Sequence, residues 1–149
     1  MRTDKPEILK RKLAYEKALS KCSRDLLKED ENPIEKSLSH LLVASQVSRI
    51  YIFKNSYSPE GHPLMSQTHE FCAQGVKSEK ENHELYDLPY LPDFKRWWQS
   101  LKQDQPIQGL VAKFPKTERE ILVPQSILSM LVIPIFINED FYGFIGFDD

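Results

Sequence analysis

The 149-residue sequence predicts an α+β fold. We expect an antiparallel sheet of about five strands with helices on both faces. Segments with the composition and apolar spacing of helices lie before and between segments rich in β-branched and aromatic residues. Three turn residues join the last two strand-like segments, a connection short enough only for antiparallel strands. The composition, 40% apolar and 28% charged, is typical of a soluble globular domain.

A long helix is predicted for residues 5–28, because good helix formers dominate this segment and no Gly, and no Pro after Pro6, interrupts it. A narrow apolar seam of coiled-coil type is predicted on this helix, because its apolar residues are spaced by four, three and four positions. They are Tyr15, Leu19, Cys22 and Leu26. Lys12 interrupts the seam. The stripe therefore suits either packing on its own domain or pairing with the same helix of a second copy.

A second helix is expected from Pro33 to about Gln46. Asn32 is a favoured N-cap residue, Pro33 suits the first helical position, and Glu35 follows the cap by three residues. These signals together predict a well-defined start for the helix.

The first strand is predicted at residues 48–54, where β-branched and aromatic residues prevail in SRIYIFK. Residues 55–63 contain the Asn, Pro and Gly that turns require, so they are expected to form a loop. Residues 64–74 then return as the hairpin partner of the first strand. The polar segment 75–90 is expected to wrap the surface without regular structure.

Residues 92–103 predict an amphipathic helix headed by Pro92. Its apolar face recurs at i, i+3, i+4 and i+7 and consists of Phe94, Trp97, Trp98 and Leu101. Adjacent residues on a helix point about 100° apart, so only one of the two tryptophans lies at the centre of the buried face. The other is expected near its edge.

Residues 106–114 suit a short strand, and residues 116–125 a short helix that Pro124 ends. Thr117 and Glu120 have the spacing of a capping box at the start of that helix. Both elements would connect the aromatic helix to the last strands.

The segment 126–137, SILSMLVIPIFI, is apolar on both faces and therefore predicts a central strand. Residues 138–140 form a turn into the closing strand, residues 141–149, which also reads as covered on both faces. A strand of this kind is an unusual end for a natural domain, so we expect an excised module of a longer protein.

The net charge of −2 is mixed along the chain, so neither nucleic acid nor an anionic membrane surface is expected as a partner. No apolar run has the roughly 18 residues of a membrane span, and no secretory signal is present, which makes a cytoplasmic location the default expectation. Cys22 and Cys72 lie in no CxxC or CxxH motif. No metal site is therefore expected.

Of the four histidines, His40, His62 and His83 are expected to be exposed to solvent, and His69 is the one candidate for a metal or acid-base role. His69 and Glu70 are neighbours on a predicted strand. Adjacent strand residues point to opposite faces, so the two side chains cannot act together unless a bulge intervenes. No catalytic residue is expected among them.

Six stretches follow one another in the order and spacing of bacterial GAF domains, which the sequence resembles: RIYIF at 49–53, HEF at 69–71, LPYL with FxxWW across 88–98, FPKTERE at 114–120, QSILSMLVIPIF at 125–136 and FYGFIGFDD at 141–149. The resemblance is closest to sensor modules of histidine kinases and diguanylate cyclases, and it covers roughly residues 20–149. It implies a six-stranded antiparallel sheet with a ligand pocket on one face and the terminal helices on the other.

The resemblance also implies a domain organisation. Residues 1–28 would be a linker or signalling helix and residues 29–149 a GAF-like sensor domain. In such domains GFIGFDD is the last core strand and a helix to the next domain follows it. We therefore expect a truncated C-terminal helix, an output domain in the same parent chain, and a homodimer.

Departures from the better-understood members bear on the cofactor. The cyclic-nucleotide-binding members carry an Asn-Lys-x-x-x-Phe-x-x-x-Asp-Glu pattern that this sequence lacks, so cyclic nucleotide is not expected. Bilin-binding members attach their chromophore through a Cys beside a His, and neither Cys22 nor Cys72 has a His neighbour, so bilin is not expected either. One GAF-fold group reduces free methionine sulfoxide through paired cysteines. Cys22 lies in a predicted helix and Cys72 in a predicted strand, so no such pair is expected.

The proposed ligand pocket consists of Phe94, Trp97, Trp98, Leu101, Gln125 and Ser129. Aromatic rings supply stacking area and indole donors, and the two polar residues would add specificity. Core packing, capping and hairpin roles explain the same residues. The leading hypothesis is thus a non-enzymatic sensory domain that binds an unidentified small molecule and relays the change through its terminal helices. The alternative is a ligand-free dimerisation or relay module, in which Phe94 and Trp97 fill the pocket.

Overall fold

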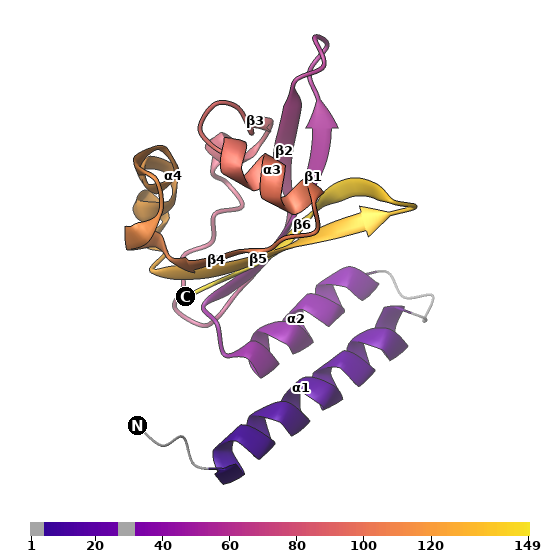
Figure 1. The fold of residues 1–149 in the computed structure, drawn as a ribbon. Coiled ribbons are helices and arrows are strands. Elements are labelled where there is room, and N and C mark those ends of the chain that lie inside the picture. Colours follow the sequence, from indigo (N-terminus) through magenta and orange to yellow (C-terminus); the bar gives the residue numbers. More distant parts are fainter. Residues whose placement is uncertain (1–4, 27–31) are drawn as a thin grey trace. The chain divides into compact units, whose positions relative to one another are not determined.

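A computed structural model describes residues 5–26 and 32–149, which form two compact units divided between Val47 and Ser48 (Figure 1). The first unit contains α1 (Lys5–Leu26) and α2 (Pro33–Ser45). Both helices were predicted, although residues 27 and 28 lie outside the described residues. Gln46 ends α2 with a left-handed φ of 56°, and its backbone N–H donates to the Leu42 carbonyl at 3.1 Å.

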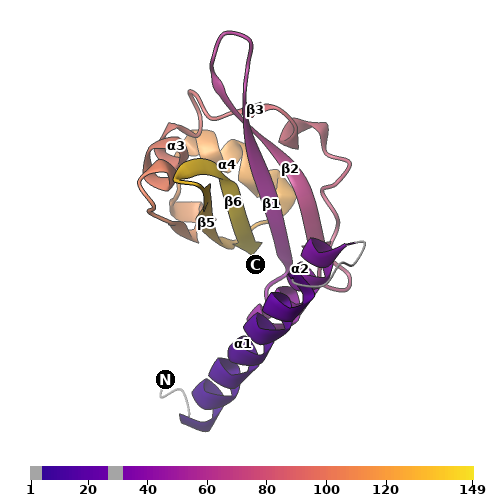
Figure 2. The ribbon, with the colours of Figure 1, turned by 90° about the vertical axis from the view of Figure 1, so that its right-hand side faces the viewer.

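The second unit is built on a six-stranded sheet in the order β3-β2-β1-β6-β5-β4, with every neighbouring pair antiparallel (Figures 1 and 2). The strands are β1 (Arg49–Tyr57), β2 (Pro63–Cys72), β3 (Leu88–Pro89), β4 (Ile107–Leu110), β5 (Ser129–Ile137) and β6 (Asp140–Asp148). Two helices accompany them, α3 (Lys95–Lys102) and α4 (Lys116–Leu122). The predicted α+β class with about six antiparallel strands is therefore confirmed.

Several local predictions differ from the structure; among them, the segment 75–90 is not irregular throughout, since it contains the short 3-10 helix His83–Leu85 and strand β3. The predicted loop at 55–63 is shorter, because β1 continues through Tyr57 and pairs with the start of β2. The predicted capping box in α4 is wrong, because the helix begins at Lys116 and places Thr117 inside its first turn. The Thr117 hydroxyl donates instead to the Asp93 carbonyl at 3.3 Å. The side chain of Asn32 precedes α2 as expected but makes no cap hydrogen bond.

The hydrophobic core of the second unit lies between one face of the sheet and α3 with α4. Tyr51 and Phe53 of β1 point to this face, as the strand period requires of residues two apart. From α3, Trp97 and Leu101 are buried, and Phe94 at the helix start is buried with them. The predicted aromatic face of this helix is thus directed into the core.

The pairing of β1 with β2 shifts by one residue after Ile52, which leaves Thr68 as the extra residue of a β-bulge. Along a regular strand, residues three apart point to opposite faces. The bulge brings Gln67 and Glu70 onto the same face, where Gln67 Nε2 lies 3.5 Å from Glu70 Oε2. Both side chains are buried.

Gly146 of β6 makes room for the ring of Tyr51 on the neighbouring strand. The two residues are directly paired in the sheet. A Cβ atom at position 146 would overlap the Tyr51 ring. The absence of a side chain therefore allows Tyr51 to lie flat against β6, with its hydroxyl directed along the strand toward Asp148.

Candidate functional site

A small cavity lies in the core of the second unit, between the sheet, α3 and α4. Its volume is about 30 Å³. Such a volume holds about two water molecules, since one water needs at least about 10–15 Å³ by this measure. Its walls are formed by Arg49, Tyr51, Phe53, Met65, Gln67, Leu85, Leu88, Phe94, Trp97, Ile121, Leu122, Gln125, Ile127, Phe144 and Asp148.

Five aromatic residues contribute to the cavity's apolar wall. Phe53 stacks on Phe144 with ring centroids 4.9 Å apart. Trp97 meets Phe144 edge-on at 5.8 Å and Phe94 edge-on at 5.1 Å. Tyr51 meets Phe53 edge-on at 5.6 Å. These offset and edge-to-face contacts are the preferred geometries of aromatic pairs, so the wall is well packed.

The opposite end of the cavity is polar and is held by β1 and β6. Arg49 and Asp148 are directly paired across these strands. The Tyr51 hydroxyl donates to Asp148 Oδ1 at 2.7 Å, and Arg49 Nη2 donates to the Gln125 carbonyl at 2.9 Å. Burial raises the pKa of Asp148 from an ordinary value of 3.8 to about 7, although the Tyr51 hydrogen bond and the charge of Arg49 both lower it.

Three polar atoms of the cavity wall have no hydrogen-bond partner among the described residues: Arg49 Nε, Trp97 Nε1 and Asp148 Oδ2. Two are donors and the third is a carboxyl oxygen. A buried polar atom without a partner costs about 1–3 kcal/mol. A polar occupant of the cavity would remove this cost.

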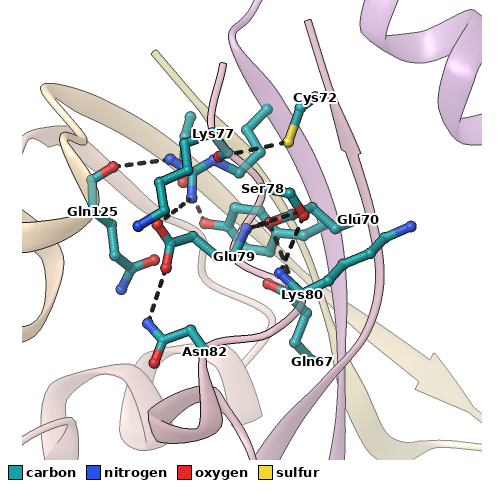
Figure 3. A network of polar contacts seen from close by, with 12 residues as sticks. Gln67, Glu70, Cys72, Lys77, Ser78, Glu79, Lys80, Asn82 and Gln125 are labelled. Atoms are coloured by element: carbon teal, nitrogen blue, oxygen red, sulfur yellow. Dashed lines mark hydrogen bonds and ion pairs between the residues drawn. The ribbon is translucent and has the colours of Figure 1, made fainter. Parts of the chain in front are cut away.

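The buried Glu70 binds residues 78 and 79, which follow β2, and holds this segment at the polar end of the cavity (Figure 3). The Ser78 hydroxyl and the backbone N–H of Glu79 both donate to the Glu70 carboxylate, the latter at 3.1 and 3.0 Å from the two oxygens. Asn82 Nδ2 donates to Glu79 Oε2 at 2.9 Å. Glu79 Oε1 lies 4.0 Å from Arg49 Nη1. Residues 78–82 have the irregular structure that the sequence predicts, and these hydrogen bonds hold them over the polar end of the cavity as a strap.

Two larger cavities lie outside this polar end, with volumes of about 310 and 330 Å³. Arg49, Gln125 and Asp148 line both the first of these and the inner cavity. Glu79 and Gln125 line both outer cavities. The inner and outer cavities thus adjoin at these polar residues.

Three of the six predicted pocket residues line the inner cavity: Phe94, Trp97 and Gln125. Leu101 is buried in the same core without lining the cavity. Ser129 is the first residue of β5, and its backbone exchanges hydrogen bonds of 2.9 Å with Asp149. Their role in ligand binding stays a prediction.

Trp98 lies at the edge of the core, as the 100° offset from its neighbour on the helix requires. Its ring is tilted against Tyr90 at 5.0 Å and Phe141 at 5.6 Å. Lys102 Nζ lies 4.8 Å from the centroid of the indole. Trp98 therefore belongs to a separate aromatic group and does not line the inner cavity.

The predicted seam of α1 is described only in part. Tyr15 and Leu19 are exposed on this helix. The side chains of Cys22 and Leu26 lie outside the description. The seam's role in dimerisation or signalling stays a prediction.

His69 and Glu70 of β2 point to opposite faces of the sheet, because the bulge at Thr68 precedes both of them. His69 Nδ1 lies 3.0 Å from the Thr68 hydroxyl, whereas Glu70 is buried beneath the strap. Burial, reinforced by Glu70, raises the pKa of the half-buried Cys72 thiol to about 11, so the reactive thiolate is disfavoured. Within the described ranges, no group of three or more His, Cys, Asp or Glu side chains could hold a metal ion.

The fold and this site can be compared with known proteins. The phycoerythrobilin-bound GAF domain of a cyanobacterial phytochrome superposes with a TM-score of 0.69 at 15% identity, over 92% of this chain and 82% of its own. A phycocyanobilin-bound GAF domain, also from a cyanobacterial phytochrome, gives a TM-score of 0.63 at 16% identity over 93% and 79%. The chain therefore has the fold of a GAF domain, as its sequence resemblance predicts.

A curated relative lies closer in sequence. The methanogenesis regulatory histidine kinase FilI of Methanothrix harundinacea is 41% identical over 106 residues, which are 71% of this chain. The match spans only 12% of the length of that kinase. No protein-family model matches the sequence.

The expectation that bilin finds no support is wrong. Two of the structures above are GAF domains with a bound bilin, and a far-red absorbing protein with bound biliverdin superposes with a TM-score of 0.63 at 16% identity, over 89% of this chain and 80% of its own. The lack of a Cys beside a His in this sequence is therefore not sufficient to exclude bilin.

The helices of the structure also bear on membrane association. In residues 5–26 and 32–149, none of the helices combines the length and the apolarity that a bilayer crossing demands.

Proposed function

We propose that this chain is a non-catalytic sensory domain that binds a small molecule in the inner cavity and regulates an output domain of the same protein. The observation that carries the proposal is the group of three polar atoms, on Arg49, Trp97 and Asp148, that have no partner among the described residues and whose side chains line one small cavity. Buried polar atoms in native proteins normally have partners, and their concentration in one cavity is typical of a binding site.

The comparisons support the regulatory part of this proposal. The 41% identical segment belongs to a regulatory histidine kinase, and it covers a small fraction of that protein. A domain of this size would therefore act beside a kinase domain and not as the kinase itself. The output domain of the present chain is a histidine kinase or a related signalling enzyme in this proposal.

Bilin belongs among the candidate ligands, because structures with this fold bind it. Asp148 Oδ2 would provide an acceptor for the pyrrole N–H groups of a linear tetrapyrrole, and the aromatic wall would contact its rings. The cavity of about 30 Å³ would have to enlarge, since pockets for drug-sized ligands are about 300–1,000 Å³. The outer cavities beside Arg49 and Gln125 provide adjoining space.

The signal would pass by a population shift. A ligand that binds more tightly when the strap and α3 are displaced favours that arrangement by its differential affinity. The relay in this proposal runs through α1, whose exposed apolar residues could pair with a second copy.

Native and denaturing mass spectrometry of the full chain, purified from cells, tests the proposal on one sample. We expect a non-covalent mass that is lost on denaturation, and a visible absorption band if that mass is a bilin. The matched control is Trp98→Phe, which alters an aromatic residue outside the cavity and should retain the ligand. A Trp97→Phe variant that retains it equally well would contradict the assignment of the pocket.

The alternative function is a ligand-free dimerisation module. The small volume of the cavity, about 30 Å³, favours it, because Phe94, Trp97 and Phe144 pack against one another at the cavity wall. A dimer without additional mass, unchanged by any added ligand, would support this alternative.

A further inference from the structure

The chemistry of the inner cavity restricts its ligand. Arg49, Trp97 and Asp148 are only 5%, 3% and 2% exposed, so bulk water does not satisfy their free polar atoms. Arg49 Nε and Trp97 Nε1 require an acceptor, while the carboxylate form of Asp148 Oδ2 requires a donor. The ligand therefore presents both kinds of group, and the question is which one carries charge.

Charge around the polar end is unbalanced. Among the buried groups at this end, three are carboxyl groups, those of Glu70, Glu79 and Asp148, and one is a guanidinium, that of Arg49, whereas the neighbouring Lys77 and Lys80 are exposed to solvent. Glu79 is 4.0 Å from Arg49, and Glu70 receives neutral donors from the strap. Asp148 takes part in none of the ion pairs formed by the described residues. A cation beside Asp148 Oδ2 would correct this imbalance, whereas an anion would increase the repulsion.

The apolar wall favours the same sign of charge. Phe53, Phe94, Trp97 and Phe144 line the cavity, and the face of an aromatic ring attracts cations through its quadrupole. A carboxylate opposite aromatic rings suits a protonated nitrogen, because such a group can donate a hydrogen bond to the carboxylate and make a cation–π contact with a ring. The sheet register fixes this arrangement, because Asp148 and Phe144 point to the same face of β6.

We propose that the cavity binds its ligand through a protonated amine, whose N–H group donates to Asp148 Oδ2, while an oxygen of the ligand or a water accepts from Trp97 Nε1. This inference rests on the proposed function and names the chemical class of its ligand. Methylammonium, with two heavy atoms, matches a cavity that holds about two waters. Methanol and formate are the neutral and anionic probes of similar size.

The indole N–H resonances of the two tryptophans report binding in the full chain. Trp97 lines the cavity and Trp98 does not, so Trp98 is an internal control, and Trp98→Phe assigns the two signals. At constant ionic strength, we expect methylammonium to shift the Trp97 resonance with a saturable, millimolar dependence. Methanol and formate should bind at least ten-fold more weakly. Asp148→Asn should weaken methylammonium binding at least ten-fold.

A pH titration of the unmutated chain gives a second readout that does not depend on the variant folding. Asp148 faces Arg49 and Tyr51 of β1 and Glu70 of β2, and its pKa is raised to about 7 by burial. Methylammonium remains protonated well above that pH, so its affinity follows the ionisation of Asp148. We expect the affinity to rise about ten-fold between pH 6 and pH 8.

The amine assignment is overturned by any of three results: equal or tighter binding of formate or methanol, unchanged methylammonium binding in Asp148→Asn, or an affinity that is flat or falls with pH. An acidic or neutral ligand identified by mass spectrometry would overturn it as well, while leaving the proposed function intact. A chain that carries no ligand from cells and responds to no probe would contradict both proposals.

Discussion

Arg96 of α3 binds Glu118 of α4 with two hydrogen bonds, from Nε to Oε1 at 3.0 Å and from Nη2 to Oε2 at 2.6 Å. Glu118 is fully buried, and the guanidinium of Arg96 lies 4.8 Å from the centroid of the Phe114 ring. The bidentate geometry fixes both the distance and the orientation of the two helices. Since Trp97 is the neighbour of Arg96, this pair also holds the indole at the cavity wall.

Replacing Glu118 with Gln should lower the free energy of unfolding by about 1.5–3 kcal/mol, because charged hydrogen bonds are lost and an amide N–H group then faces the guanidinium. Urea unfolding followed by tryptophan fluorescence measures the change. The control is Glu120→Gln, which breaks an exposed pair with Lys116 at 3.7 Å and should change stability by less than about 1 kcal/mol. Equal effects of the two variants would contradict a special role for the buried pair.

Asp148 should make the domain less stable as the pH rises. Its pKa is about 7 when folded against an ordinary 3.8, so the folded state binds the proton more tightly than the unfolded state. This contribution is fully present below about pH 4 and is lost as the pH rises through about 7, with a total on the order of 4 kcal/mol for a shift of about three units.

The matched measurement is the difference in free energy of unfolding between the unmutated chain and Asp148→Asn, followed from pH 4 to pH 8. Subtraction removes the other titrating groups, and we expect the difference to fall between about pH 4 and pH 7 and then to level off. A constant difference would show that Asp148 does not titrate with a raised pKa.

Tyr51→Phe should raise the pKa of Asp148 further. The tyrosine hydroxyl donates to Asp148 Oδ1 at 2.7 Å and thereby lowers the pKa of this carboxyl. The variant leaves the ring and its packing in place, so the change isolates one hydrogen bond. Titration of the Asp148 carboxyl carbon by NMR measures it, and an unchanged or lower pKa would contradict the prediction.

Gly146→Ala should displace the Tyr51 ring, because the added methyl group would overlap it. We expect a loss of stability of about 1–3 kcal/mol, the usual cost of overpacking a core. The Tyr51 hydroxyl should also move away from Asp148. Gly61→Ala is the comparison variant. Its added methyl group meets no atom within 4 Å, but the backbone φ of 85° strains an alanine, so this variant shows the cost of backbone strain without side-chain overlap.

Much of the fold could be predicted from local patterns. The aromatic helix at 92–103 and the apolar strand at 126–137 follow from periodicity and turn residues, which act over a few neighbours. Boundaries were less accurate, as at Ser126, which adopts a left-handed φ of 61° and delays the start of β5 to Ser129. This conformation ends the short 3-10 helix Val123–Gln125. It could not be predicted from the sequence, because left-handed conformations are typical of Gly and Asn, not of Ser.

Only part of the site could be predicted, because its polar residues meet through the sheet register. Arg49 alternates with Tyr51 and Phe53 in RIYIF, and Asp148 alternates with Phe144 and Gly146, so both had the signal of a charged residue at an inward position. Their pairing across β1 and β6 depends on residues 99 positions apart in the chain. Ligand chemistry was harder still, since the bilin-bound structures share the fold at 15–16% identity.

The extra residue at Thr68 has a consequence for how this protein could evolve. Loss of that single codon would restore strict alternation along β2, while Gln67 and Glu70 would keep their partners Phe53 and Tyr51 on β1. Glu70 would still point to the cavity and bind the segment at residues 78 and 79. An in-frame deletion of Thr68 would therefore leave the site covered, so a lineage could lose this residue without changing the polar end of the cavity.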